Sequence, residues 1–258
     1  MVYVREYWND RANRAEKAKQ HTKDMDTRYK KQIDAVVRNT KTYGTDFDLD
    51  PNGSKLIKII VEDTDTVSAA SKHKEGKCAL LNFSSYVHPG GKFIEGSKAQ
   101  EECICHESFL YNVLFEFENS FYAWNNKYKN RALYTNRGLY SPGIVFEHNG
   151  KAFTYDVITC AAPNKSAAQK YQDVSNAENT KCLRARIKFV LDMAKDNEVN
   201  TLILGAYGCG VFGQDPEEVA GIFKEYLDSS HKCFDNVVFA IPSGTNGNLE
   251  AFKKVFKM

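Results

Sequence analysis

Two consecutive carboxylates, Glu101 and Glu102, follow a loop with three glycines and could carry out acid–base chemistry. The loop leaves the apolar run Cys78–Phe83, passes Gly90 and Gly91, and ends where a helix is predicted to begin at Gln100. Glycines let a backbone approach a ligand closely, and burial beside a like charge raises the pKa of a carboxyl group. The acids also fit a purely structural role, because carboxylates in a first helical turn stabilise it by about 0.3–1 kcal/mol.

A second glycine-rich segment, Gly205–Gly213, could hold a phosphate. It lies between an apolar run and a helix start at Asp215-Pro216, so its backbone N–H groups can form an anion-binding nest. Gly208–Gly213 matches the pattern G-x-G-x-x-G, but a dinucleotide-binding fold is excluded because no acid ends the next predicted strand. The pattern G-x-x-x-x-G-K-[ST] is absent from the sequence, which argues against a nucleoside triphosphatase. We therefore expect a phosphate loop late in an α/β chain.

The elements that position these loops alternate between strands and helices. β-branched apolar runs predict strands, and helical patterns with capping signals at Ser175 and Asp215 separate most of them. The stretch between Tyr134 and Lys151 is predicted to form a hairpin, and the polar stretch Asn9–Asn39 to form one or two solvated helices. The predicted strands are Leu56–Val61, Cys78–Phe83, Tyr155–Cys160, Thr201–Tyr207 and Asn236–Ile241. This alternation predicts a mixed, largely parallel sheet between helices.

Composition narrows the class of protein. The chain has 258 residues, 42% of them hydrophobic, and a formal net charge of +2, so we expect no nucleic-acid partner from bulk charge. The charged start of the sequence predicts neither a signal peptide nor a membrane span. The seven cysteines lie mostly in apolar runs, which predicts reduced thiols and a cytoplasmic location.

Three motifs together resemble the microbial-type poly(ADP-ribose) glycohydrolases, a branch of the macrodomain fold. They are Pro89-Gly90-Gly91-Lys92 followed after seven residues by Gln100-Glu101-Glu102, the stretch Asp156–Asn164, and the late loop Gly205–Gly213, in the order of the family. The resemblance implies a macrodomain-like three-layer α/β/α sandwich. It also implies a helical extension over residues 1–54, packed on a catalytic domain over residues 55–258.

The resemblance implies hydrolysis of the ribose–ribose O-glycosidic bonds of poly(ADP-ribose), with release of ADP-ribose and without a metal or other cofactor. Glu102 would be the acid/base, and Glu101 would contact the substrate ribose. Tyr86 and Pro163 are weaker candidates for the adenosine side. Expected substrate contacts are Asn82, Gly90, Gly91, Lys92, Gln100, Gly208, Cys209, Gly210, Val211, Phe212 and Gly213. The expected ligand is ADP-ribose or its polymer, either free or on ADP-ribosylated proteins.

Lys92 departs from the pattern of the family, which has a third glycine at this point. A lysine does not freely adopt positive φ, so it either reshapes the loop or adds a charge beside the diphosphate, which is the outcome we expect. Two alternatives stay open: a macrodomain that binds ADP-ribose without cleaving it, and a hydrolase acting on ADP-ribose attached to a protein side chain or nucleobase.

Other conspicuous residues have simpler interpretations. Cys103 and Cys105 are two apart on a predicted helix and point about 200° apart, so they cannot face one metal ion. Small size accounts for Cys209, and His88 is expected at the rim of the loop or in its turn. The aromatic residues between Phe109 and Trp124 are predicted to belong to the core.

Overall fold

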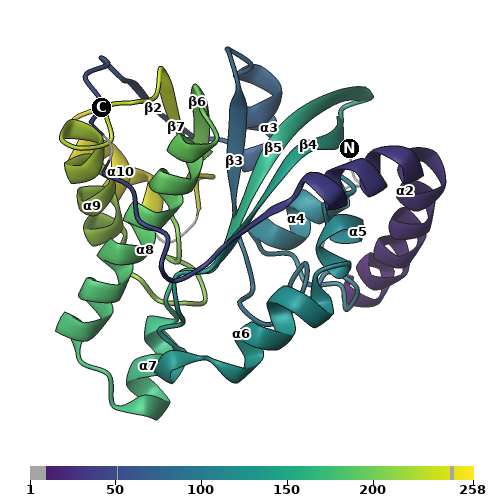
Figure 1. Ribbon diagram of the computed structural model, residues 1–258, viewed down its shortest axis with the longest axis horizontal. Coiled ribbons are helices and arrows are strands. Elements are labelled where there is room, and N and C mark those ends of the chain that lie inside the picture. Colours follow the sequence, from purple (N-terminus) through teal and green to yellow (C-terminus); the bar gives the residue numbers. More distant parts are fainter. Residues whose placement is uncertain (1–9, 51, 245–246) are drawn as a thin grey trace.

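One seven-stranded sheet forms the centre of the computed structural model, which describes residues 10–50, 52–244 and 247–258 (Figure 1). Its strands are β1 Lys41–Tyr43, β2 Lys58–Glu62, β3 Cys78–Phe83, β4 Gly138–His148, β5 Lys151–Cys160, β6 Thr201–Leu204 and β7 Asn236–Ala240. The α-helices are α2 Arg11–Asn39, α3 Thr66–Lys72, α4 Gln100–His106, α5 Leu110–Phe115, α6 Ala123–Lys127, α7 Lys165–Gln172, α8 Asn176–Asp196, α9 Pro216–Asp228 and α10 Asn248–Phe256. A π-helical turn covers Glu118–Tyr122, and a 3-10 turn covers Asn130–Ala132.

The sheet is mixed and largely parallel, as predicted. The strand order is β1-β4-β5-β3-β6-β7-β2. The central strand β3 pairs in parallel with β5 and β6, and β7 pairs in parallel with β6 and β2. The strands β1 and β4 are antiparallel to their neighbours. The carboxyl ends of β3, β5, β6 and β7 therefore meet at one edge of the sheet, where ligands of α/β folds bind.

All five predicted strands are present: Cys78–Phe83 has the predicted bounds, and the others differ at one or both ends. The strand predicted to reach Tyr207 stops at Leu204, because Tyr207 N–H donates to the Gly205 carbonyl in a turn. The predicted hairpin is confirmed: β4 and β5 pair over their length and turn at Asn149 and Gly150, which both have positive φ. The three-residue strand β1 was not predicted, since it is too short to show a period.

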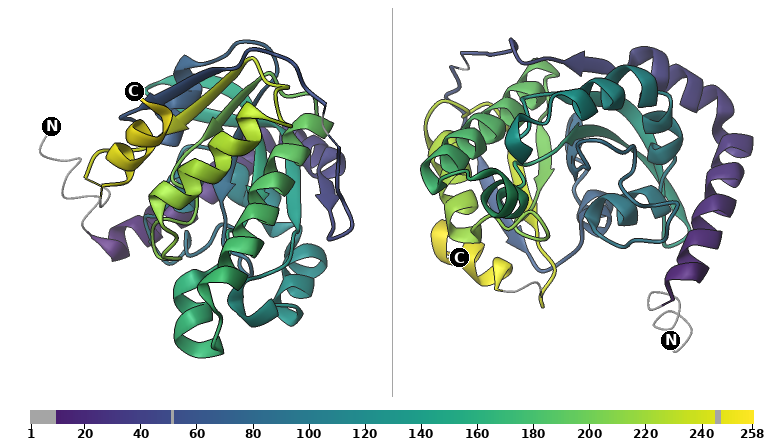
Figure 2. Two further views of the ribbon diagram at one scale, coloured as in Figure 1. Left: turned by 90° about the vertical axis from the view of Figure 1, so that its left-hand side faces the viewer. Right: turned by 90° about the horizontal axis from the view of Figure 1, so that it is seen from below.

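Two helical layers cover the sheet, because successive side chains of each strand point to opposite faces. Leu81 of β3 packs in one core with residues of α8, α9 and α10. Leu80 packs in the other core with residues of α2, α3, α4 and α5. Figure 2 shows the sheet between these two groups of helices. The three-layer α/β/α arrangement is confirmed.

The predicted N-terminal helical stretch is one long helix, α2, with a kink at Tyr29. One face of α2 is buried, including Ala18, Met25 and Ile33, so the helix is only partly solvated. It packs against α5 and β4. The predicted start at Asn9 lies outside the described residues. Within the described part of the chain, no helix is both long and apolar enough to cross a membrane.

Candidate functional site

A cavity of about 460 Å³ lies at the carboxyl ends of the parallel strands. Segments from the ends of β2, β3, β6 and β7 converge on it. Its lining includes Asp65, Val67, Phe83, Gln100, Cys103, Gly208, Val211, Phe212, Ile241 and Asn248. The cavity therefore contains the second glycine loop and the first residue of α4, two of the segments that the sequence motifs single out.

The second glycine loop presents backbone donors beside the cavity. Gly208 and Gly213 have φ of +78° and +70°, which turns the chain sharply between β6 and α9. Among the described residues, no acceptor faces the N–H groups of Gly208, Gly210, Val211 and Phe212. Such a set of unpaired N–H groups before a helix N-terminus is typical of an anion site. The geometry fits the phosphate loop expected from the sequence.

The two glutamates of α4 lie under the first glycine loop. A Cβ atom placed on Gly91 would lie 2.5 Å from Glu102 Oε1 and 2.9 Å from Glu101 Oε2. The two carboxylates therefore approach the same point, and any larger residue at Gly91 would displace them. Gln100 and Cys103, which flank the pair in sequence, line the cavity, whereas the glutamates face the loop.

Glu101 is 3% exposed and is surrounded by donors from the end of β3. Its Oε2 accepts the Ser85 N–H at 2.6 Å, and its Oε1 accepts Asn82 Nδ2 at 3.1 Å. Burial, reinforced by the nearby Glu102 carboxylate, nevertheless raises the pKa of Glu101 to about 8. Glu101 therefore holds a proton at neutral pH.

Glu102 is 6% exposed and is fixed by the backbone on both sides. Its Oε1 accepts the N–H of Lys92 at 2.9 Å, and its Oε2 accepts the N–H of Ala99 at 2.8 Å. A carboxyl group can make further hydrogen bonds beyond these two. Glu102 thus joins the first glycine loop to the start of α4.

Gln100 and Asn82 position this pair. Gln100 Oε1 accepts the Phe83 N–H at 2.8 Å and its Nε2 donates to the Leu81 carbonyl at 2.7 Å, so its amide group fastens α4 to β3. Asn82 is fully buried, and its Oδ1 has no hydrogen-bond partner among the described residues. A buried acceptor without a partner is uncommon and is available to a ligand hydroxyl.

Helix α2 holds the far end of the first glycine loop. Arg14 is 6% exposed, and its Nε donates to the Gly96 carbonyl at 2.7 Å. A Cβ atom on Gly96 would lie 2.1 Å from the Arg11 carbonyl, so only glycine fits against the helix. Arg11 Nε adds a hydrogen bond to the Glu95 carbonyl at 2.9 Å. The N-terminal helix therefore contributes to the shape of the site.

Lys92 contributes its backbone here, while its side chain points outward. It is not among the residues with positive φ, and its side chain is 58% exposed with Nζ 3.9 Å from Glu95 Oε2. The loop has positive φ at Gly90, Gly91 and Gly96, and not at Lys92. A lysine at this position is thus compatible with the loop that encloses the carboxylates.

The remaining predicted residues are distributed around the site. Gln100, Gly208, Gly210, Val211 and Phe212 line the cavity, whereas Asn82, Gly90, Gly91, Lys92, Glu101, Glu102, Cys209 and Gly213 do not. Tyr86 is 2% exposed and stacks on Tyr134, so it lies inside the protein and does not line the cavity. The Pro163 carbonyl accepts Gln214 Nε2, and burial raises the pKa of Cys209 to about 12.

Two further expectations concern metals and aromatic residues. Cys103 and Cys105 both belong to α4, as predicted, and no group of metal-ligating side chains occurs within residues 10–50, 52–244 and 247–258. Phe109, Phe121 and Tyr122 are buried, in agreement with the core prediction, while Phe115 is 49% exposed.

Sequence reasoning missed Asp65, Ile241 and Asn248, which line the cavity. Asp65 caps α3 after β2, Ile241 directly follows β7, and Asn248 begins α10. Parallel strands end at the same edge of a sheet, so polar residues just after each predicted strand were the available signal.

The comparisons with known proteins agree with this geometry. The family model described as "Microbial-type PARG, catalytic domain" matches residues 12–148; PARG is poly(ADP-ribose) glycohydrolase. The Deinococcus radiodurans enzyme in complex with ADP-ribose is 31% identical, with a TM-score of 0.81, over 87% of this chain and 97% of that one. The Thermomonospora curvata enzyme bound to the inhibitor ADP-HPD is 28% identical, with a TM-score of 0.81, over 95% and 99%. No curated protein matches the sequence.

Proposed function

This chain belongs to the microbial-type poly(ADP-ribose) glycohydrolase family, and we propose that it hydrolyses the ribose–ribose O-glycosidic bonds of poly(ADP-ribose) and releases ADP-ribose. The observation that carries this proposal is the pair Glu101 and Glu102, held under Gly91 beside a cavity with unpaired N–H groups. Acid–base groups and a phosphate-binding backbone are the two parts that such a glycosidase needs.

The terminal ADP-ribose unit is the part of the substrate that the cavity would bind. The N–H groups of Gly208, Gly210 and Val211 would donate to its diphosphate, and the apolar side chains of Val67 and Ile241 would contact its base. No cationic side chain is needed at the diphosphate, since backbone donors supply the electrostatic stabilisation. The ribose at the other end of the unit would then approach the start of α4, where Gln100 lines the same cavity as Phe212.

Glu102 is our candidate for the acid/base. A carboxyl proton passes to the bridging oxygen, the C1–O bond breaks with its electron pair on that oxygen, and positive charge develops on the ribose. The carboxylate then takes a proton from water as the water oxygen attacks C1. The carboxyl group keeps capacity for this exchange, because each oxygen accepts one backbone hydrogen bond, from Lys92 or Ala99.

Glu101 is our candidate for the ribose contact. It holds a proton near pH 7, because burial and the neighbouring Glu102 raise its pKa, and a protonated carboxyl group can donate a hydrogen bond to a ribose hydroxyl. The partnerless Oδ1 of Asn82, which lies on the adjacent strand end, supports a hydroxyl-binding role for this corner of the site.

The position of Lys92 removes the main argument for the alternative function, a macrodomain that binds ADP-ribose without cleaving it. The Lys92 side chain lies beside Glu95, and the loop still closes over both carboxylates.

We further propose that the chain divides into a helical extension over residues 1–54 and a catalytic domain over residues 55–258. We also propose a cytoplasmic location, which is supported by the seven cysteines being free thiols in the structure.

The test is to incubate the purified chain with poly(ADP-ribose) and to measure free ADP-ribose over time. We expect release by the unmodified chain and none by Glu102→Gln, with ADP-ribose binding retained in both proteins. Binding of ADP-ribose without any release from the polymer would support the binding module instead.

A further inference from the structure

A basic surface with aromatic side chains adjoins the candidate site. It consists of two segments, residues 123–137 and 164–172, which together contain six Lys or Arg and no Asp or Glu. The segments touch: the Asn164 N–H donates to the Ala132 carbonyl, and α7 packs on the turn Asn130–Ala132. Helices α6 and α7, which belong to these segments, both lie beyond the lower end of the sheet in Figure 1. We call this surface the α6–α7 surface.

Each glycine loop is connected directly to the α6–α7 surface. Asn125 Nδ2 donates to the Tyr86 carbonyl at 2.8 Å, one residue after Ser85, whose N–H holds Glu101. On the other side, the Ser166 N–H donates to the Phe212 carbonyl at 3.0 Å. The surface therefore begins where the proposed scissile bond would lie, at the carboxylate end of the site.

The charge of the α6–α7 surface is largely available. Lys127, Lys129 and Lys170 are exposed, and these lysines and Lys165 form no ion pair with any described residue. Arg131 is the exception, since it pairs with Glu178. Unpaired cations on an acid-free surface attract a polyanion.

Aromatic rings on the same surface are already ordered. The centroids of the Trp124 and Tyr128 rings are 4.3 Å apart with the planes tilted by 36°, and the Arg137 guanidinium lies 4.1 Å from the Trp124 ring centroid. Tyr128 is still 52% exposed, and Tyr171 on α7 is 68% exposed. Exposed rings held in place by neighbours are the platforms on which nucleobases stack.

The backbone of this surface is strained. Asn130, Arg131, Ala132 and Tyr134 all have positive φ, a conformation that costs energy for residues other than glycine. Hydrogen bonds from other elements hold the strained segment, including the one from Asn164. Strained backbone of this kind clusters at functional sites.

From these observations we propose that the α6–α7 surface binds the units of poly(ADP-ribose) that precede the bond being cleaved. This rests on the proposed function and extends it from the terminal unit to the polymer. Each unit carries a diphosphate and an adenine, so lysines such as Lys127 and Lys129 contact phosphates while the exposed face of Tyr128 stacks on a base. The surface raises affinity for long chains and contributes nothing to the binding of monomeric ADP-ribose.

The test compares KM for long poly(ADP-ribose) with the Kd for ADP-ribose, using the full chain. The charge-reversal pair Lys127→Glu with Lys129→Glu is expected to raise KM about tenfold without changing kcat, and to flatten the salt dependence of KM. The matched control reverses Lys19 and Lys31, which are exposed on α2 and have no ion-pair partner among the described residues. We expect the control to leave KM near its starting value.

A second pair of variants separates stacking from charge. Tyr128→Ala is expected to raise KM for long chains about 5- to 150-fold, the range for loss of one stacked base, whereas Tyr128→Phe keeps the ring and the KM. Both are compared with ADP-ribose binding by calorimetry.

The outcomes separate this inference from the proposed function. Two results would contradict polymer binding by the α6–α7 surface while leaving the proposed hydrolase activity in place. In both, the unmodified chain releases ADP-ribose; in the first the α6–α7 variants have an unchanged KM, and in the second the control variant raises KM equally. Equal affinity of the surface for single-stranded DNA would also overturn it. If the unmodified chain releases no ADP-ribose, the proposed function itself fails, and the extension fails with it.

Discussion

The backbone N–H of Lys92 donates a hydrogen bond of 2.9 Å to Glu102 Oε1. The residue that replaces a glycine of the family pattern thus supports the proposed acid/base through its main chain, which any residue but proline would provide. Its ammonium group lies on the outer side of the loop beside Glu95.

Replacing Lys92 by alanine is therefore expected to change little. The side chain is 58% exposed, and a surface ion pair contributes about 0–1 kcal/mol. Affinity for ADP-ribose should stay within about twofold and turnover should be unchanged, measured by calorimetry and by ADP-ribose release. A tenfold loss of affinity would show that the ammonium reaches the diphosphate, as the sequence suggested. Glu95→Gln, which removes the partner of Lys92, serves as the control.

Glu102→Gln is expected to remove turnover and to reduce stability. General acid–base catalysis typically contributes 10²- to 10⁴-fold, or about 3 to 5 kcal/mol of transition-state stabilisation. The amide nitrogen of glutamine would also face an N–H of either Lys92 or Ala99, which costs about 1–3 kcal/mol of unfolding free energy.

The matched control for Glu102→Gln is Glu107→Gln at the end of the same helix. Glu107 pairs with His148, away from the cavity, so its replacement should leave turnover intact. Polymer turnover and chemical unfolding are the two measurements. Near-normal turnover in Glu102→Gln would refute the assignment of Glu102.

The pKa of Glu101, about 8, predicts an alkaline limit to activity. As pH rises through about 8, Glu101 loses its proton and becomes a charged neighbour of the proposed acid/base Glu102. The ratio kcat/KM should therefore fall in this range, and Glu101→Gln should lose this alkaline fall while keeping a reduced rate. If the pH profile of kcat/KM for Glu101→Gln shows the same alkaline fall, the fall belongs to another titrating group.

The same shift predicts how stability depends on pH. The folded-state pKa of Glu101 lies above its ordinary value of 4.5, so the folded protein binds the extra proton between these two pH values. The contribution of Glu101 to stability is fully present below pH 4.5 and is lost as pH rises to about 8. The unfolding free energy of the unmodified chain should fall relative to that of Glu101→Gln across this window. Urea unfolding at several pH values measures this difference.

Most of the fold was predictable because its signals are local. The strand Cys78–Phe83 is buried on both sides and reads as a continuous apolar run, and the capping residues Ser175 and Asp215 start their helices as expected. The strand β1 escaped prediction because pairing with β4, not its three residues, makes it a strand.

The site was predictable only in part, for a physical reason. The glycine loops and the glutamate pair are contiguous in sequence, so their types and spacing are visible. The pKa of Glu101 depends on burial under Gly91, and the outward direction of Lys92 depends on the path of the loop. Contacts such as Asn82 with Glu101 join separate elements and appear only in three dimensions.

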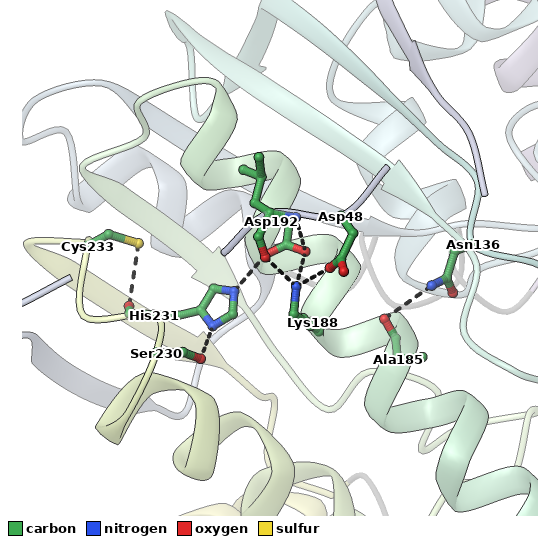
Figure 3. A network of polar contacts seen from close by, with 9 residues as sticks. Asp48, Asn136, Ala185, Lys188, Asp192, Ser230, His231 and Cys233 are labelled. Atoms are coloured by element: carbon green, nitrogen blue, oxygen red, sulfur yellow. Dashed lines mark hydrogen bonds and ion pairs between the residues drawn. The ribbon is translucent and has the colours of Figure 1, made fainter. Parts of the chain in front are cut away.

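A buried network of polar contacts surrounds Asp192 in α8 (Figure 3). We expect removal of the Asp192 carboxylate to reduce the stability of the protein. Asp192 is 1% exposed and accepts hydrogen bonds from Lys188 Nζ at 2.8 Å and His231 Nε2 at 2.9 Å. Lys188 also donates to the Leu49 carbonyl at 2.7 Å, which ties the segment after β1 to α8.

Asp192→Ala is expected to reduce the unfolding free energy by about 1–3 kcal/mol, since it leaves Nε2 of the buried His231 without this hydrogen-bond partner and removes one of the two carboxylates that contact Lys188. The control is Glu225→Ala, which removes an exposed ion pair with Arg184 and should change stability far less. Chemical unfolding of both variants measures the difference, and equal costs would contradict a buried, coupled network.

Two glycines of the phosphate loop predict opposite responses to the same substitution. Gly213 has a φ of +70°, and a Cβ atom there would lie 2.2 Å from Ser166 Oγ. Gly210 has no positive φ, and a Cβ atom there would have no neighbour within 4 Å. Gly213→Ala should cost about 1–2 kcal/mol for the left-handed conformation alone and should weaken ADP-ribose binding by distorting the loop. Gly210→Ala should keep the loop and the affinity. Calorimetry measures the affinity of both variants for ADP-ribose, and thermal unfolding measures their stability. Equal affinities of the two variants would mean that the binding of ADP-ribose does not depend on the shape of this loop.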